Sequence, residues 1–214
     1  MDSKIMSKVF FWMFIGLAVT FVTGSVVANN PDMVLEIFKG GNVFILGIIE
    51  IVLVIWLSAR ITKMSSTSAK IMFILYSFVT GLTFSSIFIV YNISSIIYVF
   101  LATSIIMLLF ALFGYFTKID LLKFSTFLFV GILGIIIMGI INLFVGSETF
   151  SLAICAISIV LFMIYIAFDI QSIKRLYNRG DIPEDNVAIY GALQLYLDFI
   201  NIFIDLLRIF GKDN

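Results

Sequence analysis

The chain has 214 residues, of which 62% are hydrophobic and 12% are charged, and its mean hydropathy is +1.20. A soluble domain has roughly 45–50% apolar and about 25% charged residues, so this composition excludes an ordinary soluble domain. The 13 basic side chains equal the 13 acidic ones in number, and a basic surface for nucleic acid is therefore not expected.

Apolar segments of about 20 residues, enough to cross about 30 Å of hydrocarbon, recur along the chain. The first follows Lys4 and Lys8, and it is too long for a signal-peptide core of about 7–15 residues. The seven predicted spans are Lys8–Ala28, Asn42–Ile61, Ile71–Tyr91, Ile93–Phe116, Phe124–Val145, Phe150–Ile173 and Val187–Phe210. These spans predict an all-α, polytopic membrane protein with a single transmembrane domain over residues 1–214.

Two connections carry clear signals. The third and fourth spans are separated only around Asn92, which predicts a tight hairpin. The longest connection between the later spans, 174–186, holds Gly180 and Pro183, which are typical of a helix end and of the start of the next helix.

Lysine and arginine are unevenly divided between the two sets of predicted loops, by ten to three. Loops rich in these residues face the cytoplasm, so we expect a cytoplasmic N-terminus in a multi-pass protein of the plasma membrane. The residues of the first side are Lys4, Lys8, Arg60, Lys63, Lys70, Lys118, Lys123, Lys174, Arg175 and Arg179, and those of the second are Lys39, Arg208 and Lys212.

Five charged residues within predicted spans are candidate functional residues: Glu50, Arg60, Asp169, Asp198 and Asp205. A charge at mid-bilayer costs about 2.5–3.5 kcal/mol on insertion scales, so such residues normally face the protein interior and mark functional sites. The absence of histidine excludes imidazole pH switches, and any pH sensing is therefore expected from carboxyl groups. The single cysteine, Cys155, permits no internal disulfide and is interpreted as a packing residue.

The last span carries a polar stripe in an otherwise apolar helix. Its members are separated by four, three, four and three residues, which places them on one face; they are Gln194, Asp198, Asn201, Asp205 and Arg208. This pattern predicts an inner helix whose stripe lines a polar cavity, although a hydrogen-bonded seam that only holds helices together would show the same spacing.

The depths of these residues suggest which of them meet. Asp169 and Arg60 each lie near the cytoplasmic end of their spans, and Asp198 is deeper but within reach if the helices tilt. Glu50 is near mid-span and is better placed to meet Arg208, whereas Asp205 is expected to pair with Arg208 along one helix. Two carboxyl groups in a low-dielectric site titrate as a unit, and their oxygens suit Ca²⁺, so the sequence indicates cation passage controlled by protonation.

The motif Tyr165-Ile-Ala-Phe-Asp169-Ile-Gln171, together with the later segment from Gly191 to Arg208 that contains Leu-Tyr-Leu-Asp198-Phe-Ile-Asn, resembles the Bax inhibitor-1 (transmembrane Bax-inhibitor-motif) family. The short termini are similar to those of its bacterial YetJ type. The resemblance implies a last helix enclosed by three antiparallel helix pairs and a pH-sensitive calcium leak. It further implies that Asp169 and Asp198 form the proton-sensitive pair, that Arg60 latches onto Asp169, and that Glu50 pairs with Arg208.

We expect a monomeric, non-enzymatic protein that needs no cofactor and whose partners are calcium ions, protons and the lipid bilayer. Ca²⁺, as the transported ion, would bind Asp169 and Asp198. A calcium/proton exchanger and an intramembrane aspartyl protease stay open as alternatives, although the Gly-x-Gly-Asp signature of such proteases is absent. An interaction protein without transport activity is a further alternative. A retinal photoreceptor is excluded because no lysine lies between Val187 and Phe210.

Overall fold

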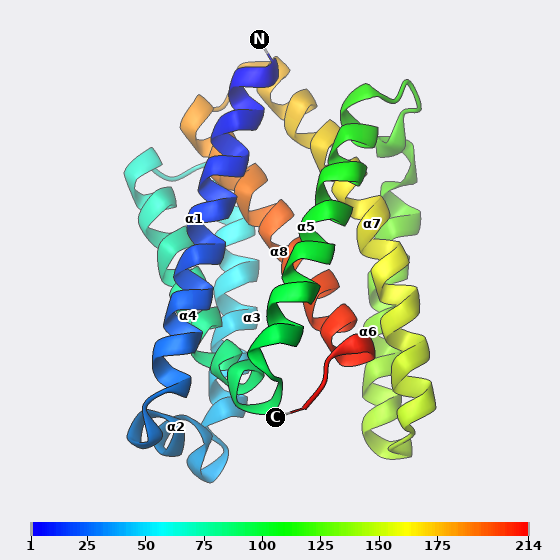
Figure 1. Cartoon of the computed structure of the whole chain (residues 1–214). Coiled ribbons are helices and arrows are strands. Elements are labelled where there is room, and N and C mark those ends of the chain that lie inside the picture. The colour runs from blue at the N-terminus through cyan, green and yellow to red at the C-terminus, as the bar shows by residue number, and fades with distance from the viewer. Residues whose placement is uncertain (1, 214) are drawn as a thin grey trace. The chain divides into compact units, whose positions relative to one another are not determined.

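The computed structural model describes residues 2–213, which are helical along most of their length (Figure 1). Seven helices in this part of the chain are long and apolar enough to cross a membrane, which confirms the predicted all-α, polytopic class. The helices are α1 (Asp2–Ala28), α2 (Pro31–Phe38), α3 (Asn42–Arg60), α4 (Ser66–Val90), α5 (Ile93–Phe116), α6 (Ser125–Val145), α7 (Glu148–Arg179) and α8 (Glu184–Phe210), with short 3-10 turns at Lys39–Gly41 and Leu121–Phe124.

Two features differ from the sequence-based expectation. The short helix α2 occupies what was predicted to be a loop, and the side chain of Asn30 caps its first turn by accepting from the Met33 amide at 3.3 Å. The connection 174–186 is also shorter than predicted, because α7 continues to Arg179 and α8 begins at Glu184. A hydropathy pattern registers only the apolar part of a helix, so polar helical ends are missed. Gly180, with φ of 72°, and Pro183 occupy the remaining turn.

The described residues pack as two units. Unit 1 consists of 2–92, 173–196 and 213, and unit 2 consists of Ile93–Ser172 and Leu197–Lys212. Each unit therefore contains part of α7 and part of α8. The prediction of a single domain over 1–214 stays a prediction.

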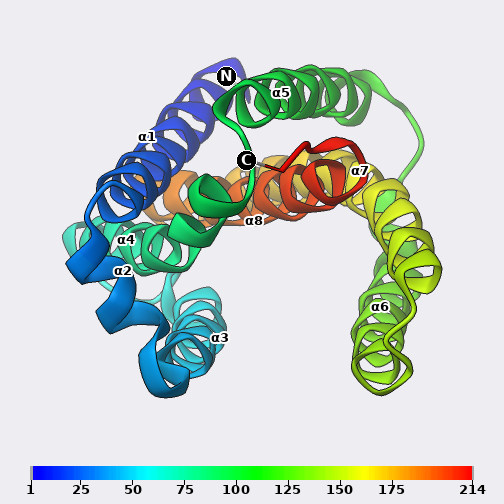
Figure 2. The same ribbon diagram turned by 60° about the horizontal axis from the view of Figure 1, so that its bottom comes forward.

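In unit 1, α1 lies alongside α4 in both ribbon views (Figures 1 and 2), and the two run in the same direction because α3 reverses the chain between them. Their close approach depends on glycine. A Cβ on Gly81 of α4 would lie 2.6 Å from the Thr23 side chain and 2.9 Å from the Thr20 carbonyl oxygen, which is closer than real Cβ atoms approach. The antiparallel neighbour of α4 is α3.

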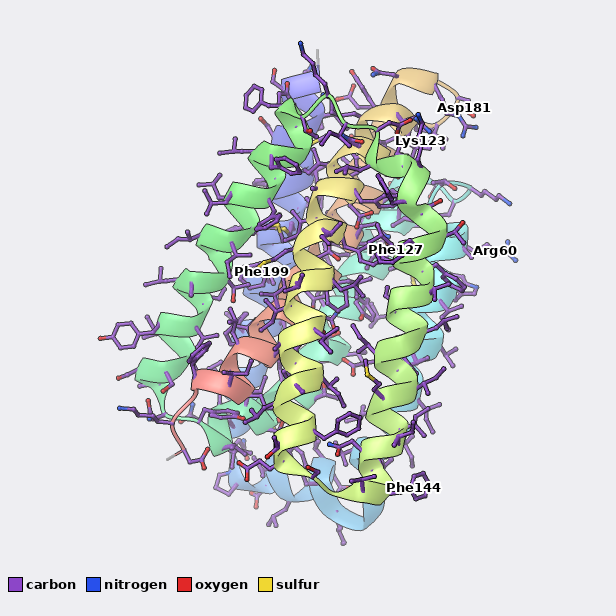
Figure 3. All side chains as sticks on the ribbon, turned by 90° about the vertical axis from the view of Figure 1, so that its right-hand side faces the viewer. Arg60, Lys123, Phe127, Phe144, Asp181 and Phe199 are labelled. Atoms are coloured by element: carbon purple, nitrogen blue, oxygen red, sulfur yellow. The ribbon has the colours of Figure 1, made fainter. Side chains whose placement is uncertain are left out.

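In unit 2, α6 and α7 form an antiparallel hairpin, which is visible in Figure 3 with Lys123 and Phe144 near opposite ends of α6. Gly146 ends α6 with φ of 64°, the left-handed conformation that favours glycine after a helix. On the other side of α7, a Cβ on Gly114 of α5 would lie 2.5 Å from the Ala167 carbonyl oxygen, so the two backbones touch there.

The buried share differs widely among the spans. In α8, 72% of the most apolar window is buried inside the protein, whereas in the spans of α3 and α6 the buried share is 6%. The outer surfaces of α3 and α6 carry large apolar side chains, such as Phe44, Ile48, Phe127 and Phe144, and these faces suit lipid contact. The most buried span is thus the one that carries the polar stripe. The three antiparallel pairs around it stay a prediction.

Candidate functional site

Two carboxyl groups meet in unit 2. Asp169 lies on α7 and Asp198 lies on α8; each residue is only 3% exposed, and their side chains are within hydrogen-bonding range of each other. The Oδ2 atom of Asp198 is buried and has no hydrogen-bond partner among the described residues. The pair that sequence spacing suggested is therefore formed, and it retains one oxygen that a ligand or a proton can engage.

Aromatic residues lie near the pair along α7 and α8. Tyr165, one helical turn before Asp169, is close enough to interact electrostatically with both carboxyl groups, and its ring packs edge-on against Phe168 at 6.0 Å. Next to Asp198, the ring of Phe199 packs against that of Phe100 at 5.2 Å, and Figure 3 marks its position. Both carboxyl groups are buried, so two negative charges would be costly to hold side by side.

Asp169 is held in position by its neighbours on α7. Gln171 donates from Nε2 to the Ile119 carbonyl at 2.8 Å and accepts from the Leu121 amide at 2.9 Å, which fastens α7 to the connection between α5 and α6. The contact of Gly114 with Ala167 brings α5 against α7 two residues before Asp169. The glutamine of the recognised motif thus has a structural role beside the pair.

A second polar group of unit 2 lies further along α8. Asp205 is near Ser158 and Cys155 of α7, and Arg208 is close enough to act on it electrostatically. No ion pair within 4 Å joins Asp205 to Arg208 among residues 2–213, so Asp205 faces α7 hydroxyl and thiol groups rather than a salt bridge along its own helix. Asn201 donates from Nδ2 to the Leu197 carbonyl at 2.7 Å, so this side-chain hydrogen bond lies within α8 itself.

The two residues from the second predicted span lie in unit 1. Arg60 is exposed at the end of α3, where Figure 3 marks it, and within its own unit it makes no ion pair. Glu50, midway along the same helix, accepts a hydrogen bond from the Thr83 hydroxyl at 3.1 Å. The latch between Arg60 and Asp169 and the pair of Glu50 with Arg208 stay predictions.

Sequence reasoning missed a polar clasp at the start of α8 in unit 1. Asp185 accepts from Lys8 at 3.3 Å and from Lys70 at 2.5 Å, and Lys8 also lies 2.8 Å from Glu184. Beside them the fully buried Asn186 donates to two carbonyls at the end of α3, those of Ile61 and Met64. The run Glu-Asp-Asn after Pro183 was the available signal, because such residues favour a helix N-terminus.

Fold and site together define an integral membrane protein with a buried carboxyl pair on its last two helices. The family model described as "Inhibitor of apoptosis-promoting Bax1" matches residues 2–214. The chain belongs to the Bax inhibitor-1 family, as its motifs indicated.

Bacterial relatives match over nearly the same length. The chain is 40% identical to inner membrane protein YbhL of Escherichia coli strain K12, over 97% of this chain and 91% of the relative. It is 36% identical to an uncharacterized protein of Borreliella burgdorferi, over 98% and 92% of the two chains. It is 37% identical to an uncharacterized membrane protein of Streptococcus pyogenes serotype M1, over 89% and 79%. These matches support a multi-pass membrane protein.

Proposed function

We propose that this protein is a pH-sensitive calcium leak channel, gated by protonation of the Asp169–Asp198 pair. One observation carries the proposal: two carboxyl groups, each 3% exposed, lie within hydrogen-bonding range inside the membrane-spanning part of the chain. A proton or a cation is needed to relieve the repulsion between two such groups, so the two ligands compete for the same oxygens.

The chemistry of the pair suits passage better than storage of calcium. Ca²⁺ takes about 6–8 oxygen ligands, and two carboxyl groups offer at most about four. No group of three or more His, Cys, Asp or Glu side chains that could hold a metal gathers within residues 2–213. Water would complete the coordination of a passing ion, which makes binding weak enough for release, as conduction requires.

In this proposal Arg60 is the latch. Its side chain is exposed and free of ion pairs within unit 1, so it is available for a partner that depends on the state of the channel. An ionised Asp169 would attract the guanidinium group, and a protonated Asp169 would release it. The proposal places the N-terminus in the cytoplasm and the protein in the plasma membrane as a monomer without enzymatic activity.

The test is calcium flux into dye-loaded proteoliposomes across a pH series. The wild type is expected to change its flux with pH, whereas Asp169→Asn and Asp198→Asn should each give a flux that no longer follows pH. Asp181→Asn is the matched control, because Asp181 is exposed and pairs with the nearby Arg179 at 2.8 Å. Wild-type pH dependence in both pair variants would reject the pair as the sensor.

A calcium/proton exchanger is the second candidate, favoured by the same observation. A carboxyl pair that binds either a proton or a cation can carry the two in opposite directions if the protein alternates access. An imposed proton gradient should then drive calcium uphill in the same vesicles, whereas a leak only dissipates a calcium gradient.

A further inference from the structure

The short helix α2 connects two spanning helices of unit 1. Only Asn29 and Asn30 separate it from α1, and the turn Lys39–Gly41 separates it from α3. Both ribbon views place it beyond the ends of α1 and α3 and between the two (Figures 1 and 2). The helix α2 therefore lies at the level where these two spans leave the hydrocarbon.

The helix α3 is long enough to cross the membrane without α2. Its 19 residues extend about 29 Å at a rise of about 1.5 Å per residue, which matches the hydrocarbon thickness of about 30 Å. If α2 continued straight along the axis of α3, its 8 residues would project about 12 Å further, into water. The direction of α2 therefore decides whether its apolar side chains meet water or lipid.

Two glycines turn the chain between α2 and α3. Gly40 and Gly41 have φ of 58° and 87°, consecutive left-handed conformations that a residue with a side chain rarely adopts. Directly after them, the side chain of Asn42 donates to the Glu36 carbonyl at 2.7 Å, in the last turn of α2, where helical carbonyls lack partners within the helix. With Asn30 capping the first turn, both ends of α2 are fastened, and its direction is fixed relative to α3.

The side chains of α2 are sorted around its axis. The three half-buried residues share one face, as their spacing of three and four predicts; they are Val34, Ile37 and Phe38. Asp32 and Glu36, four residues apart, are exposed on the opposite face. The helix is therefore amphipathic, with a charged face directed away from its own unit.

Two apolar side chains of α2 are left without cover by the described residues. Met33 and Leu35 are 47% and 67% exposed, and at about 100° per residue each lies on one flank of the helix, between the half-buried face and the charged face. Exposed apolar surface begins again in the first turn of α3, where Phe44 is 76% exposed, and continues at Ile48, which is 63% exposed. The flanks of α2 thus extend the lipid-facing surface of α3 to the end of the span.

We propose that α2 is an interfacial helix that binds the phospholipid surface of the leaflet opposite the N-terminus, with Met33 and Leu35 against the acyl chains and the charged face in water. Such helices sink about 5–10 Å into the boundary between headgroups and acyl chains. Two acidic residues, Asp32 and Glu36, outnumber Lys39, so burial of apolar surface holds the helix, and attraction to anionic headgroups does not. A second copy of the chain fits less well, because two exposed apolar side chains fall far short of the roughly 800 Å² per partner of a stable interface.

The test is spin-label accessibility in the full-length protein, reconstituted in phosphatidylcholine vesicles. Labels are attached to Met33→Cys and Leu35→Cys, with Glu36→Cys as the matched control in water and Ile48→Cys as the reference in hydrocarbon; all four native side chains are exposed, so the fold should be retained. The native Cys155 is 1% exposed and should not react, which labelling of the unmodified chain checks. Oxygen concentrates in hydrocarbon and a nickel chelate stays in water, so the ratio of their effects on the label reports its depth.

The oxygen-to-nickel ratio at positions 33 and 35 is expected to exceed that at 36 and to fall below that at 48, with no change when phosphatidylglycerol is added. A ratio at either position no higher than at 36 would place that flank in water and overturn the proposal. A ratio at 36 as high as at 48 would place the whole helix in hydrocarbon and also overturn it. Spin–spin broadening with both probes excluded would assign the flanks to a second copy, and a ratio that rises only with phosphatidylglycerol would assign them to headgroup charge; each result would overturn the proposal.

Discussion

The clasp at the start of α8 provides a quantitative prediction. The Asn186 side chain is fully buried, and it donates to the Ile61 carbonyl at 2.7 Å and the Met64 carbonyl at 2.8 Å and accepts from the Ser66 hydroxyl at 2.5 Å. The two carbonyls lie at and just beyond the end of α3, where helical carbonyls lack partners within the helix. Asn186 therefore joins α8 to α3 and α4 within unit 1.

Replacing Asn186 with Ala would remove the side-chain hydrogen bonds to all three partners. Leaving the buried Ile61 carbonyl without a partner would lower the free energy of unfolding by about 1–3 kcal/mol. Loss of the bond to the half-buried Met64 carbonyl, which water can reach, would lower it by about 0.5–1.5 kcal/mol. The Ser66 hydroxyl is half-buried and can bond to water, so it adds little. We expect Asn186→Ala to lower the free energy of unfolding by about 2–4 kcal/mol.

The measurement is reversible unfolding in detergent, combined with limited trypsin digestion at Lys63, which lies in the turn that Asn186 holds. Cleavage there should accelerate in Asn186→Ala. Ser66→Ala, which removes one accepted bond and retains both carbonyl bonds, is the control and should change stability by less than about 1.5 kcal/mol. Wild-type stability and cleavage rate in Asn186→Ala would refute the argument that these carbonyls depend on Asn186.

Two further predictions concern packing and charge. Gly114→Ala should destabilise the protein by about 1–3 kcal/mol in thermal unfolding, because the new Cβ would lie 2.5 Å from the Ala167 carbonyl oxygen. Gly134→Ala, whose new Cβ would have nothing within 4 Å, is the control and should be neutral or stabilising by up to about 1 kcal/mol. Equal effects of the two substitutions would contradict this reasoning. Asp185→Asn should lower the free energy of unfolding by about 0.3–1 kcal/mol at low salt and by almost nothing at high salt, because the side chains of Lys8, Lys70 and Asp185 are 39%, 32% and 37% exposed. A loss of stability that is independent of salt would show that the clasp is not electrostatic.

Much of the architecture follows from local sequence. The apolar segments predicted the seven spans and the tight turn at Asn92, because hydrocarbon thickness fixes the length of a spanning helix. The polar ends of α7 and α8 and the short helix α2 were missed, since hydropathy does not register helical residues outside the apolar region. The motifs around Asp169 and Asp198 were sufficient to predict the family.

The proximity of the acidic groups depended on tertiary structure. Spacing places Asp198 and Asp205 on one face of α8, but only packing against α7 brings Asp198 to Asp169 and Asp205 to Ser158 and Cys155. The expected link between Asp205 and Arg208 along the helix is not an ion pair in the described residues, and Asp205 lies beside Ser158 and Cys155 of α7.

The sequence by itself determined that this is a helical membrane protein and which charged residues must avoid lipid, because both follow from the cost of exposing polar groups to hydrocarbon. The tertiary structure alone decided that Glu50 meets the Thr83 hydroxyl of α4 and that Asn186 fastens the start of α8. Threonine, tyrosine and asparagine are tolerated at many helical positions, so their presence does not reveal a network. Only the packing of distant helices determines which of their hydroxyl and amide groups meet.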